Sequence, residues 1–410
     1  MRSALARTDL FDDEFRGGLP AWTYDNDEVT ALEMEHVFRR SWLVAGHVSE
    51  IPEPGDFITH DIVDERALIV RGRDGVVRAF HNLCRHRGSR VVAEDKGNCG
   101  NRIVCPFHGW CYNSDGSLRG RAAEKTFPTA DKAGLGLKPV DMEIWHGLIF
   151  VRFKGGSPAG DGPSVAETMA PVEDEIAPYR IEEMRPLFPR YRVEVDVNWK
   201  AMVDVDAEGY HVPIAHPSLM DLYGRTYRDE VLKNGLSRSY GTFHDDYDAK
   251  EWSVRHYKRI LPEVAHLPES HRRAWVYYSL FSGTALQLFP DMVDFYQFFP
   301  LSTGRSAVWG ASYALPDERR EMKLARFLNQ RINDITTEED AQLIKWSWEG
   351  MRSSAYDDFL LSDLELGVKH FHDELRAKLP VLNRTSPPPL GTVAKVNAEM
   401  AADSSYRPNI

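Results

Sequence analysis

Four metal-binding side chains stand in two short segments of the first third of the chain. Cys84 and His86 are separated by one residue, and after 18 intervening residues Cys105-Pro-Phe-His108 follows. Two Cys-plus-His pairs, each on a short turn, fit a [2Fe-2S] cluster in which thiolates hold one iron and imidazoles hold the other. Neutral imidazole raises the reduction potential above that of an all-cysteine cluster. Such a cluster accepts electrons from a reductase and passes them to a more oxidising acceptor.

Two other interpretations of these residues are open. A structural zinc site also uses two cysteines and two histidines, but its usual spacing pairs like ligands, whereas each pair here mixes them. Alternatively, the four side chains are unconnected buried residues. We favour the cluster, which leaves Cys99 and Cys111 as spare thiols that are packed or idle. Four cysteines without a secreted framework indicate a reducing compartment.

A second group of candidate ligands lies in the middle of the chain. Glu208 and His211 are three residues apart, which predicts one face of a helical turn, and Pro213 should end that helix. His216 could then swing back beside His211. Two imidazoles and one distant carboxylate would form the facial triad of oxygen-activating iron(II) enzymes. A lone His-x4-His pair is more often structural, but the cluster favours iron because one-electron delivery needs an acceptor.

The segments around the first ligand group predict a small all-β domain. From residue 42 to 153, short β runs alternate with Gly, Asp and Pro turns, and residues 67–80 read as a hairpin about Asp74-Gly75. Residues 154–163 are rich in Gly and Pro, as in a linker. We therefore expect an N-terminal segment over 1–41, the cluster domain over 42–155 and a catalytic domain over 156–410.

The remaining segments predict an α+β arrangement with a sheet packed against helices. The tail after Leu382 is expected to be an irregular arm. The expected strands are 191–197, 274–288, 293–301 and 307–315, and the expected helices are 28–42, 317–331, 338–351 and 364–379.

Composition limits the classes of partner. A formal net charge of −12 excludes nonspecific nucleic-acid binding, which needs a cationic surface. The acidic surface could steer a basic electron-transfer partner or could simply be solvated. The N-terminus alternates charges, and no segment approaches the roughly 18 apolar residues of a membrane span. We expect a soluble, cytoplasmic protein that binds neither nucleic acid nor membrane.

With both motifs in view, the chain resembles the catalytic α subunits of Rieske non-heme iron oxygenases, the ring-hydroxylating dioxygenase family. Cys84-x-His86 with Cys105-x2-His108 matches the Rieske motif, and the segment from Asn198-Trp-Lys200 to His216 matches the mononuclear-iron motif. The resemblance covers nearly the whole length. It implies a small all-β Rieske [2Fe-2S] domain and a larger catalytic domain whose antiparallel sheet wraps around helices (helix-grip, START-like).

The resemblance also implies the ligands of the mononuclear iron. His211 and His216 would bind it together with an acidic residue at the start of a late helix. Asp340 fits that place best, and Glu339 and Glu338 are the second choices. The same acidic run could instead be a helix N-terminus that opposes the macrodipole, with Thr336 or Thr337 as the cap.

Glu208 matches the family's bridging carboxylate, which carries electrons between a cluster histidine of one subunit and an iron-ligand histidine of its neighbour. The enzyme would accordingly be a homotrimer or a multiple of one. Asp204 matches another acidic family position. Val205 and Asp206 depart from the pattern, because relatives often have Asn at the first and an aromatic or aliphatic residue at the second.

The resemblance implies that electrons from NADH pass through a separate reductase, with or without a ferredoxin, to the cluster and then to iron(II), with O2 as co-substrate. This sequence carries no dinucleotide-binding G-x-G-x-x-G of its own. The Asp204-x3-Glu208 spacing looks like the carnitine, choline and betaine branch, which favours N-demethylation or hydroxylation of a small quaternary ammonium compound. Ring hydroxylation or cis-dihydroxylation of an arene is the alternative, and a plain electron carrier is disfavoured.

Aromatic residues are dense in the presumed pocket walls. Aromatic faces attract quaternary ammonium groups, although alternating aromatics in strands are usually core. The candidates are Trp252, Tyr257, Trp275, Tyr277, Tyr278, Phe281, Phe295, Tyr296 and Phe298.

Overall fold

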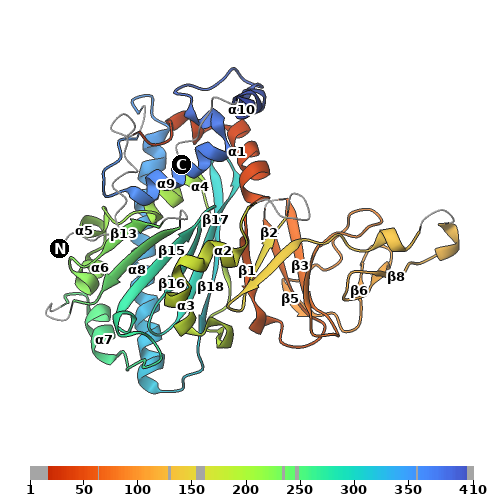
Figure 1. The fold of residues 1–410 in the computed structure, drawn as a ribbon, viewed down its shortest axis with the longest axis horizontal. Coiled ribbons are helices and arrows are strands. Elements are labelled where there is room, and N and C mark those ends of the chain that lie inside the picture. Colours follow the sequence, from red (N-terminus) through yellow and green to blue (C-terminus); the bar gives the residue numbers. More distant parts are fainter. Residues whose placement is uncertain are drawn as a thin grey trace. The chain divides into compact units, whose positions relative to one another are not determined.

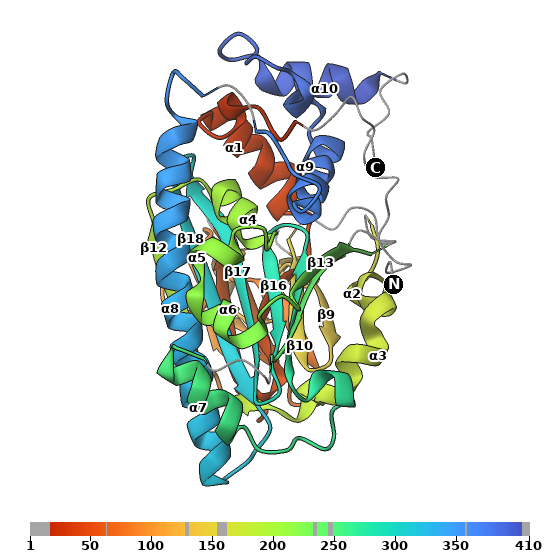
Figure 2. The same ribbon diagram turned by 90° about the vertical axis from the view of Figure 1, so that its left-hand side faces the viewer.

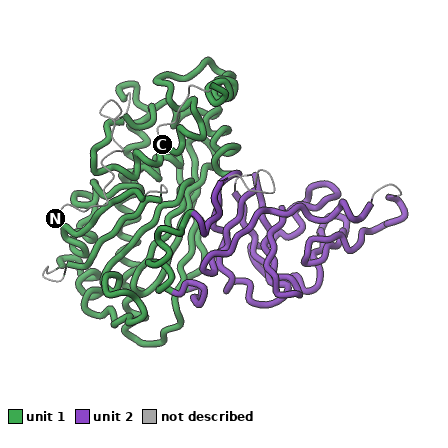
Figure 3. Tube along the Cα trace, in the orientation of Figure 1, with its two compact units in different colours: residues 1–38, 168–179, 187–410 green, residues 39–167, 180–186 purple. Residues whose placement is uncertain are grey.

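A computed structural model describes residues 17–62, 64–127, 131–153, 162–232, 236–244, 249–356 and 359–403. These divide into two compact units (Figure 3). Unit 1 comprises residues 1–38, 168–179 and 187–410, and unit 2 comprises 39–167 and 180–186. Most of the predicted linker, residues 154–161, lies outside the described part of the chain.

Unit 2 is built from short antiparallel strands, as the sequence predicted (Figure 1). The predicted hairpin is confirmed: β3 pairs with β4, and Asp74 Oδ1 accepts the Val76 amide at 3.1 Å in the turn. The strands are β1 (Leu43–His47), β2 (Asp56–Ile62), β3 (Glu65–Arg71), β4 (Val77–His81), β5 (Lys96–Asn98), β6 (Ile103–Val104), β7 (Cys111–Tyr112), β8 (Leu118–Gly120), β9 (Asp141–Trp145), β10 (Leu148–Arg152) and β11 (Arg185–Pro186). Strands β1 to β10 form sheets ordered β1-β10-β9, β4-β3-β2-β5 and β6-β7-β8.

Unit 1 is an antiparallel sheet with helices on its faces, which confirms the α+β class. Its strands follow the order β12-β18-β17-β16-β15-β14-β13. They are β12 (Tyr191–Val195), β13 (Arg228–Val231), β14 (Ser237–Thr242), β15 (Ala274–Leu280), β16 (Thr284–Leu288), β17 (Val293–Ser302) and β18 (Arg305–Ala314). The polar strands β13 and β14 were not predicted, because neither alternates clearly between apolar and polar residues.

The helices lie on both faces of this sheet. One face is covered by α4 (Trp199–Asp206), α5 (Val212–Ala215), α6 (Pro217–Tyr223), α7 (Trp252–Ile260) and α8 (Arg320–Met351) (Figure 2). Toward the other face, Glu175 of α3 (Glu173–Ile176) binds Arg238 at 3.1 Å and Tyr278. The remaining helices are α1 (Asp27–Glu33), α2 (Val165–Met169), α9 (Leu366–Lys378) and α10 (Val393–Ala402).

Four predictions about helices were wrong. The predicted pair 317–331 and 338–351 is the single helix α8, since no proline interrupts residues 320–351. Thr336 lies inside it and donates to the Ile332 carbonyl at 3.0 Å, so the acidic run at 338–340 is not a capped N-terminus. The supposedly irregular arm contains α10. The predicted 28–42 helix ends early: α1 passes into a π-helical turn at Met34–Phe38.

The described residues contain no helix that is long and apolar enough to cross a bilayer.

Helix α4, which precedes the second ligand group, is held by the Asn198-Trp199-Lys200 sequence. Asn198 caps the helix by accepting the Lys200 amide at 2.9 Å, and its own amide nitrogen donates to the carbonyls of Tyr24 and Thr303. Glu33 of α1 accepts from Lys200 Nζ at 2.5 Å and from Trp199 Nε1 at 2.8 Å. These groups are fully buried. Because water cannot solvate their charges there, the lysine and the glutamate neutralise each other.

We expect Lys200→Met to destabilise unit 1 by about 3–5 kcal/mol, because it leaves the Glu33 carboxylate buried and uncompensated. Urea denaturation followed by circular dichroism measures the loss, while cluster absorbance reports on unit 2. The double variant Glu33→Gln/Lys200→Met should recover part of the lost stability. Lys395→Met, at an exposed position, is the control and should cost less than about 0.5 kcal/mol. Equal stability of the Lys200 and Lys395 variants would refute this role.

Candidate metal centres

The four ligands predicted for the cluster come from two loops of unit 2 that share one local design. Cys84 and His86 follow β4, and Cys105 and His108 join β6 to β7. In each loop the cysteine carbonyl accepts the amide of a glycine four residues later, at 3.0 Å in both cases. These glycines, Gly88 and Gly109, have φ values of +72° and +68°, which other residues rarely adopt.

The loops bring the thiols together on one side and the imidazoles on the other. Burial raises the pKa of the Cys84 thiol, and its neighbour Cys105 adds to the shift. The rings of His86 and His108 lie 4.7 Å apart, and His86 stacks on Trp110 at 5.1 Å. His86 Nδ1 is buried and has no hydrogen-bond partner among the described residues, so this nitrogen is available to bind a metal ion.

The separation of the thiols from the imidazoles fits a site with two metal ions better than a site with one. Among the described residues, His211, His216 and Asp340 are the one group of three or more potential ligands whose donor atoms all lie within 4.8 Å of each other. The four residues of the loops therefore do not converge as a single tetrahedral zinc would require. Tyr112 also suits a cluster, because its hydroxyl lies 3.3 Å from Cys84 Sγ while its oxygen accepts the Arg85 amide at 3.0 Å.

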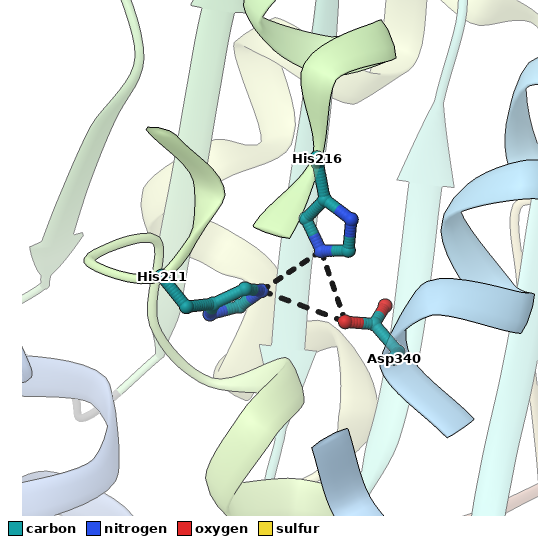
Figure 4. A group of neighbouring side chains, drawn as sticks. All are labelled: His211, His216 and Asp340. Atoms are coloured by element: carbon teal, nitrogen blue, oxygen red, sulfur yellow. Dashed lines mark hydrogen bonds and ion pairs between the residues drawn. The ribbon is translucent and has the colours of Figure 1, made fainter. Parts of the chain in front are cut away.

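In unit 1 the structure brings together the second predicted group (Figure 4). His211 Nε2 and His216 Nε2 are 3.0 Å apart, and Asp340 Oδ1 lies 2.9 Å from the second and 3.5 Å from the first. Ligands about 2.1 Å from a metal and at right angles to each other are about 3.0 Å apart. The three donors therefore fit one face of an octahedral ion. Asp340 Oδ1 is buried and receives no hydrogen bond, so its lone pairs are available to bind a metal ion.

Carboxylates behind the two imidazoles fix their orientation. Glu208 Oε1 lies 2.5 Å from His211 Nδ1, and Glu339 Oε2 lies 2.8 Å from His216 Nδ1. With Nδ1–H donating to a carboxylate, each ring presents the lone pair of Nε2 to the site. Burial lowers the pKa of His211, but Asp340 and Glu208 outweigh that effect and raise it to about 10, so the site strongly favours positive charge.

The backbone that carries these residues differs from the prediction. Helix α4 ends at Asp206, and Glu208 lies in an irregular turn whose amides bind its own carboxylate: His211 N donates to Glu208 Oε2 at 3.1 Å. Pro213 does not end a helix but lies in the first turn of α5, where its missing N–H costs nothing. Gly209 is required because a Cβ there would lie 1.9 Å from the Tyr227 ring.

Asp204 does not reach the metal triad. Its carboxylate accepts from Tyr24 Oη at 2.6 Å and lies 2.9 Å from His372 Nε2. The Leu19 amide donates to His372 Nδ1 at 3.1 Å, which places the histidine proton on Nε2. This buried network ties α4 to α9 and to the N-terminal segment.

Sequence reasoning missed three of these partners. Glu339 was considered as a ligand and not as the group that orients His216. His372 and Asp229, whose Oδ2 accepts the Gly209 amide at 2.7 Å, were not considered at all. No spacing could reveal them, because each lies on an element remote in sequence from the residue it binds.

Comparison with known proteins finds two domain families in this chain. The Rieske [2Fe-2S] domain family matches residues 41–131, and the ring hydroxylating alpha subunit (catalytic domain) family matches residues 184–380. The glycine betaine monooxygenase oxygenase subunit of Chromohalobacter salexigens is 37% identical over 396 residues, which cover 87% of this chain and 84% of that protein. The chain belongs to the Rieske non-heme iron oxygenases.

Two further relatives support the assignment of this Rieske oxygenase. The carnitine monooxygenase oxygenase subunit of Escherichia coli is 26% identical over 378 residues, covering 87% of this chain and 92% of its own. A crystal structure of a quaternary ammonium Rieske monooxygenase has the same fold, with a TM-score of 0.73, 22% identity, and coverage of 88% of this chain and 97% of the other. The protein is therefore the oxygenase subunit of an oxidoreductase system that takes electrons from a separate reductase.

We expect Asp340→Ala to lose the mononuclear metal, because two imidazoles remain without their carboxylate, while the cluster absorbance is kept. Glu339→Gln should weaken metal affinity by about 10–100-fold, since it removes the acceptor that orients His216. Iron content after dialysis against a chelator measures both.

The control is Glu338→Gln, which changes an exposed neighbour on the same helix and should keep full iron. Full iron retention by the Asp340 variant, with loss in the Glu339 variant, would make Glu339 the ligand.

Proposed function

We propose that this Rieske oxygenase removes N-methyl groups from a small quaternary ammonium compound. Cys84, His86, Cys105 and His108 would hold the [2Fe-2S] cluster. The observation that carries the iron site is the convergence of His211, His216 and Asp340, with the Nδ1 atoms of both histidines held by carboxylates. When bound there, iron(II) supplies the activation of O2 that the family performs.

The choice of substrate rests on relatives and on the pocket. The relatives matched over most of the chain are oxygenase subunits of glycine betaine and carnitine monooxygenases, and both substrates carry a quaternary nitrogen. Of the aromatic candidates, Tyr257, Trp275 and Phe295 are buried core residues. Tyr277 and Tyr296 are only half-buried, and they share the sheet face that α4 and α8 cover. Their rings are available for cation–π contact.

The overall reaction balances without a further reactant. A trimethylammonium compound, O2 and NADH give the dimethylamine, formaldehyde, water and NAD+. One oxygen atom enters the C–H bond of an N-methyl group, and the resulting carbinol loses formaldehyde when its C–N bond breaks and the nitrogen keeps the electron pair. The other oxygen atom leaves as water.

We propose Glu208 as the electron bridge between neighbouring subunits of a homotrimer or a multiple of one. It is mostly buried, yet Tyr210 beside it is 56% exposed and Ile214 is 88% exposed. Apolar exposure of this size, next to a carboxylate bound to His211, suits a surface that another subunit covers.

Formaldehyde release tests the proposed reaction. With a reductase and NADH, we expect formaldehyde in equal amount to NADH consumed from at least one N-methyl compound in a panel of betaines, quaternary amines and aromatic acids. The inactive variant Asp340→Ala is the control for formaldehyde that forms without the proposed iron site. Diol or phenol from an arene, with no formaldehyde from any N-methyl compound, would favour the ring-hydroxylating alternative.

We expect Glu208→Gln to keep both metals and to slow product formation in a single turnover by about 100-fold or more, since it removes the charged acceptor on His211. Rapid-quench measurement on the pre-reduced enzyme reports this rate, and iron content is the control. A wild-type single-turnover rate would rule out the bridge.

A further inference from the structure

Asp206 is a carboxylate at the metal site that neither the ligand set nor the bridge uses. It ends α4, two residues after Asp204, so the two side chains leave the helix on different sides. Asp204 turns to Tyr24 and His372, whereas Asp206 Oδ1 accepts a hydrogen bond from the Tyr296 hydroxyl on β17. Asp206 therefore faces the covered side of the sheet.

This carboxylate belongs to the same compartment as the metal triad. The charges of Asp340 and His211 both act on Asp206, and the charges of Asp206 and Asp340 both act on Tyr277. Tyr277 is paired directly with Gln287, whose amide donates to Tyr296 Oη at 3.3 Å. One carboxylate and two tyrosine rings thus lie together beside the proposed iron.

Asp206 has no lysine or arginine partner among the described residues. Its one hydrogen bond comes from Tyr296, and the positive charge that acts on it is that of His211. Burial raises the pKa of this carboxyl to about 7, because the charged form loses water and the Tyr296 hydroxyl and His211 offset only part of that cost. A ligand that carries a fixed positive charge would supply the missing partner.

We propose that Asp206 is a specificity-determining residue that selects substrates of net positive charge, by pairing with the ammonium centre beside the rings of Tyr277 and Tyr296. This inference rests on the proposed function and narrows it. A zwitterionic betaine brings its own carboxylate, which would add negative charge beside Asp206 and Asp340 where no described lysine or arginine compensates. A quaternary amine without a carboxylate, such as choline, suits this compartment better.

The test compares choline, glycine betaine and the uncharged carbon isostere 3,3-dimethylbutan-1-ol in the reductase-coupled holoenzyme. We expect wild-type kcat/KM for choline to exceed that for glycine betaine by roughly tenfold or more. Asp206→Asn keeps an acceptor for Tyr296 but removes the charge. It should raise KM for choline by roughly tenfold with little change in kcat, and leave inhibition by the uncharged isostere unaltered.

Two variants separate charge from structure. Asp206→Glu restores the charge and should restore the preference for choline. Asp221→Asn is the matched control: its carboxylate is also buried, but it accepts the Glu251 amide at 2.6 Å instead of a tyrosine hydroxyl, and Asp206 is left intact. This variant should keep the wild-type ratio of choline to betaine. Iron content and cluster absorbance are measured for each protein.

Three outcomes would overturn the inference. A wild-type preference for glycine betaine contradicts it, as does an Asp206→Asn variant that weakens choline and the isostere equally, and both results leave N-demethylation standing. Absence of formaldehyde from every methylated amine would instead remove the proposed function, and the inference with it.

Discussion

The buried pair of Lys200 and Glu33 is the interaction on which the catalytic unit depends. Two opposite charges without water are tolerable only together, so α1 and α4 cannot separate without exposing an unpaired charge to an apolar interior. Trp199 donates to the same carboxylate, and Asn198 fixes the first turn of α4 against the N-terminal segment and the turn between β17 and β18. The Asn-Trp-Lys sequence therefore acts as an anchor for the residues that follow it, and contributes no ligand itself.

Once α4 is fixed, each acidic residue near its end has different neighbours, and these neighbours determine its role. Asp204 is bound by Tyr24 and His372 and ties three segments together. Asp206 accepts from a tyrosine and pairs with no described lysine or arginine, and Glu208 lies against Nδ1 of His211. Asp340, from the middle of α8, lies against both Nε2 atoms. Identical chemical groups are thus placed in different surroundings, and the proposed role of each follows from its neighbours.

Much of this could be predicted from local sequence. The two Cys–His pairs and the His211 and His216 pair follow from residue type and spacing. The choice of Asp340 among three adjacent acids follows from the family resemblance, and the structure brings it together with His211 and His216. The wrong predictions also concerned local structure. The 32 residues of α8 form one helix because Asn and Thr near its centre weaken a helix without breaking it, and tertiary packing against α4, α6 and α7 decides the outcome.

The sequence by itself determined the family, the two kinds of metal centre and their ligand types, because metal coordination restricts which residues can stand at which spacing. Only the tertiary structure decided which nitrogen of each histidine faces the metal, since Glu339 arrives from a helix more than a hundred residues away. It likewise decided that Asp204 binds Tyr24 and His372, whereas Asp206 accepts from Tyr296 near the proposed iron site. These distinctions depend on burial and on partners distant in sequence, and neither is encoded in local spacing.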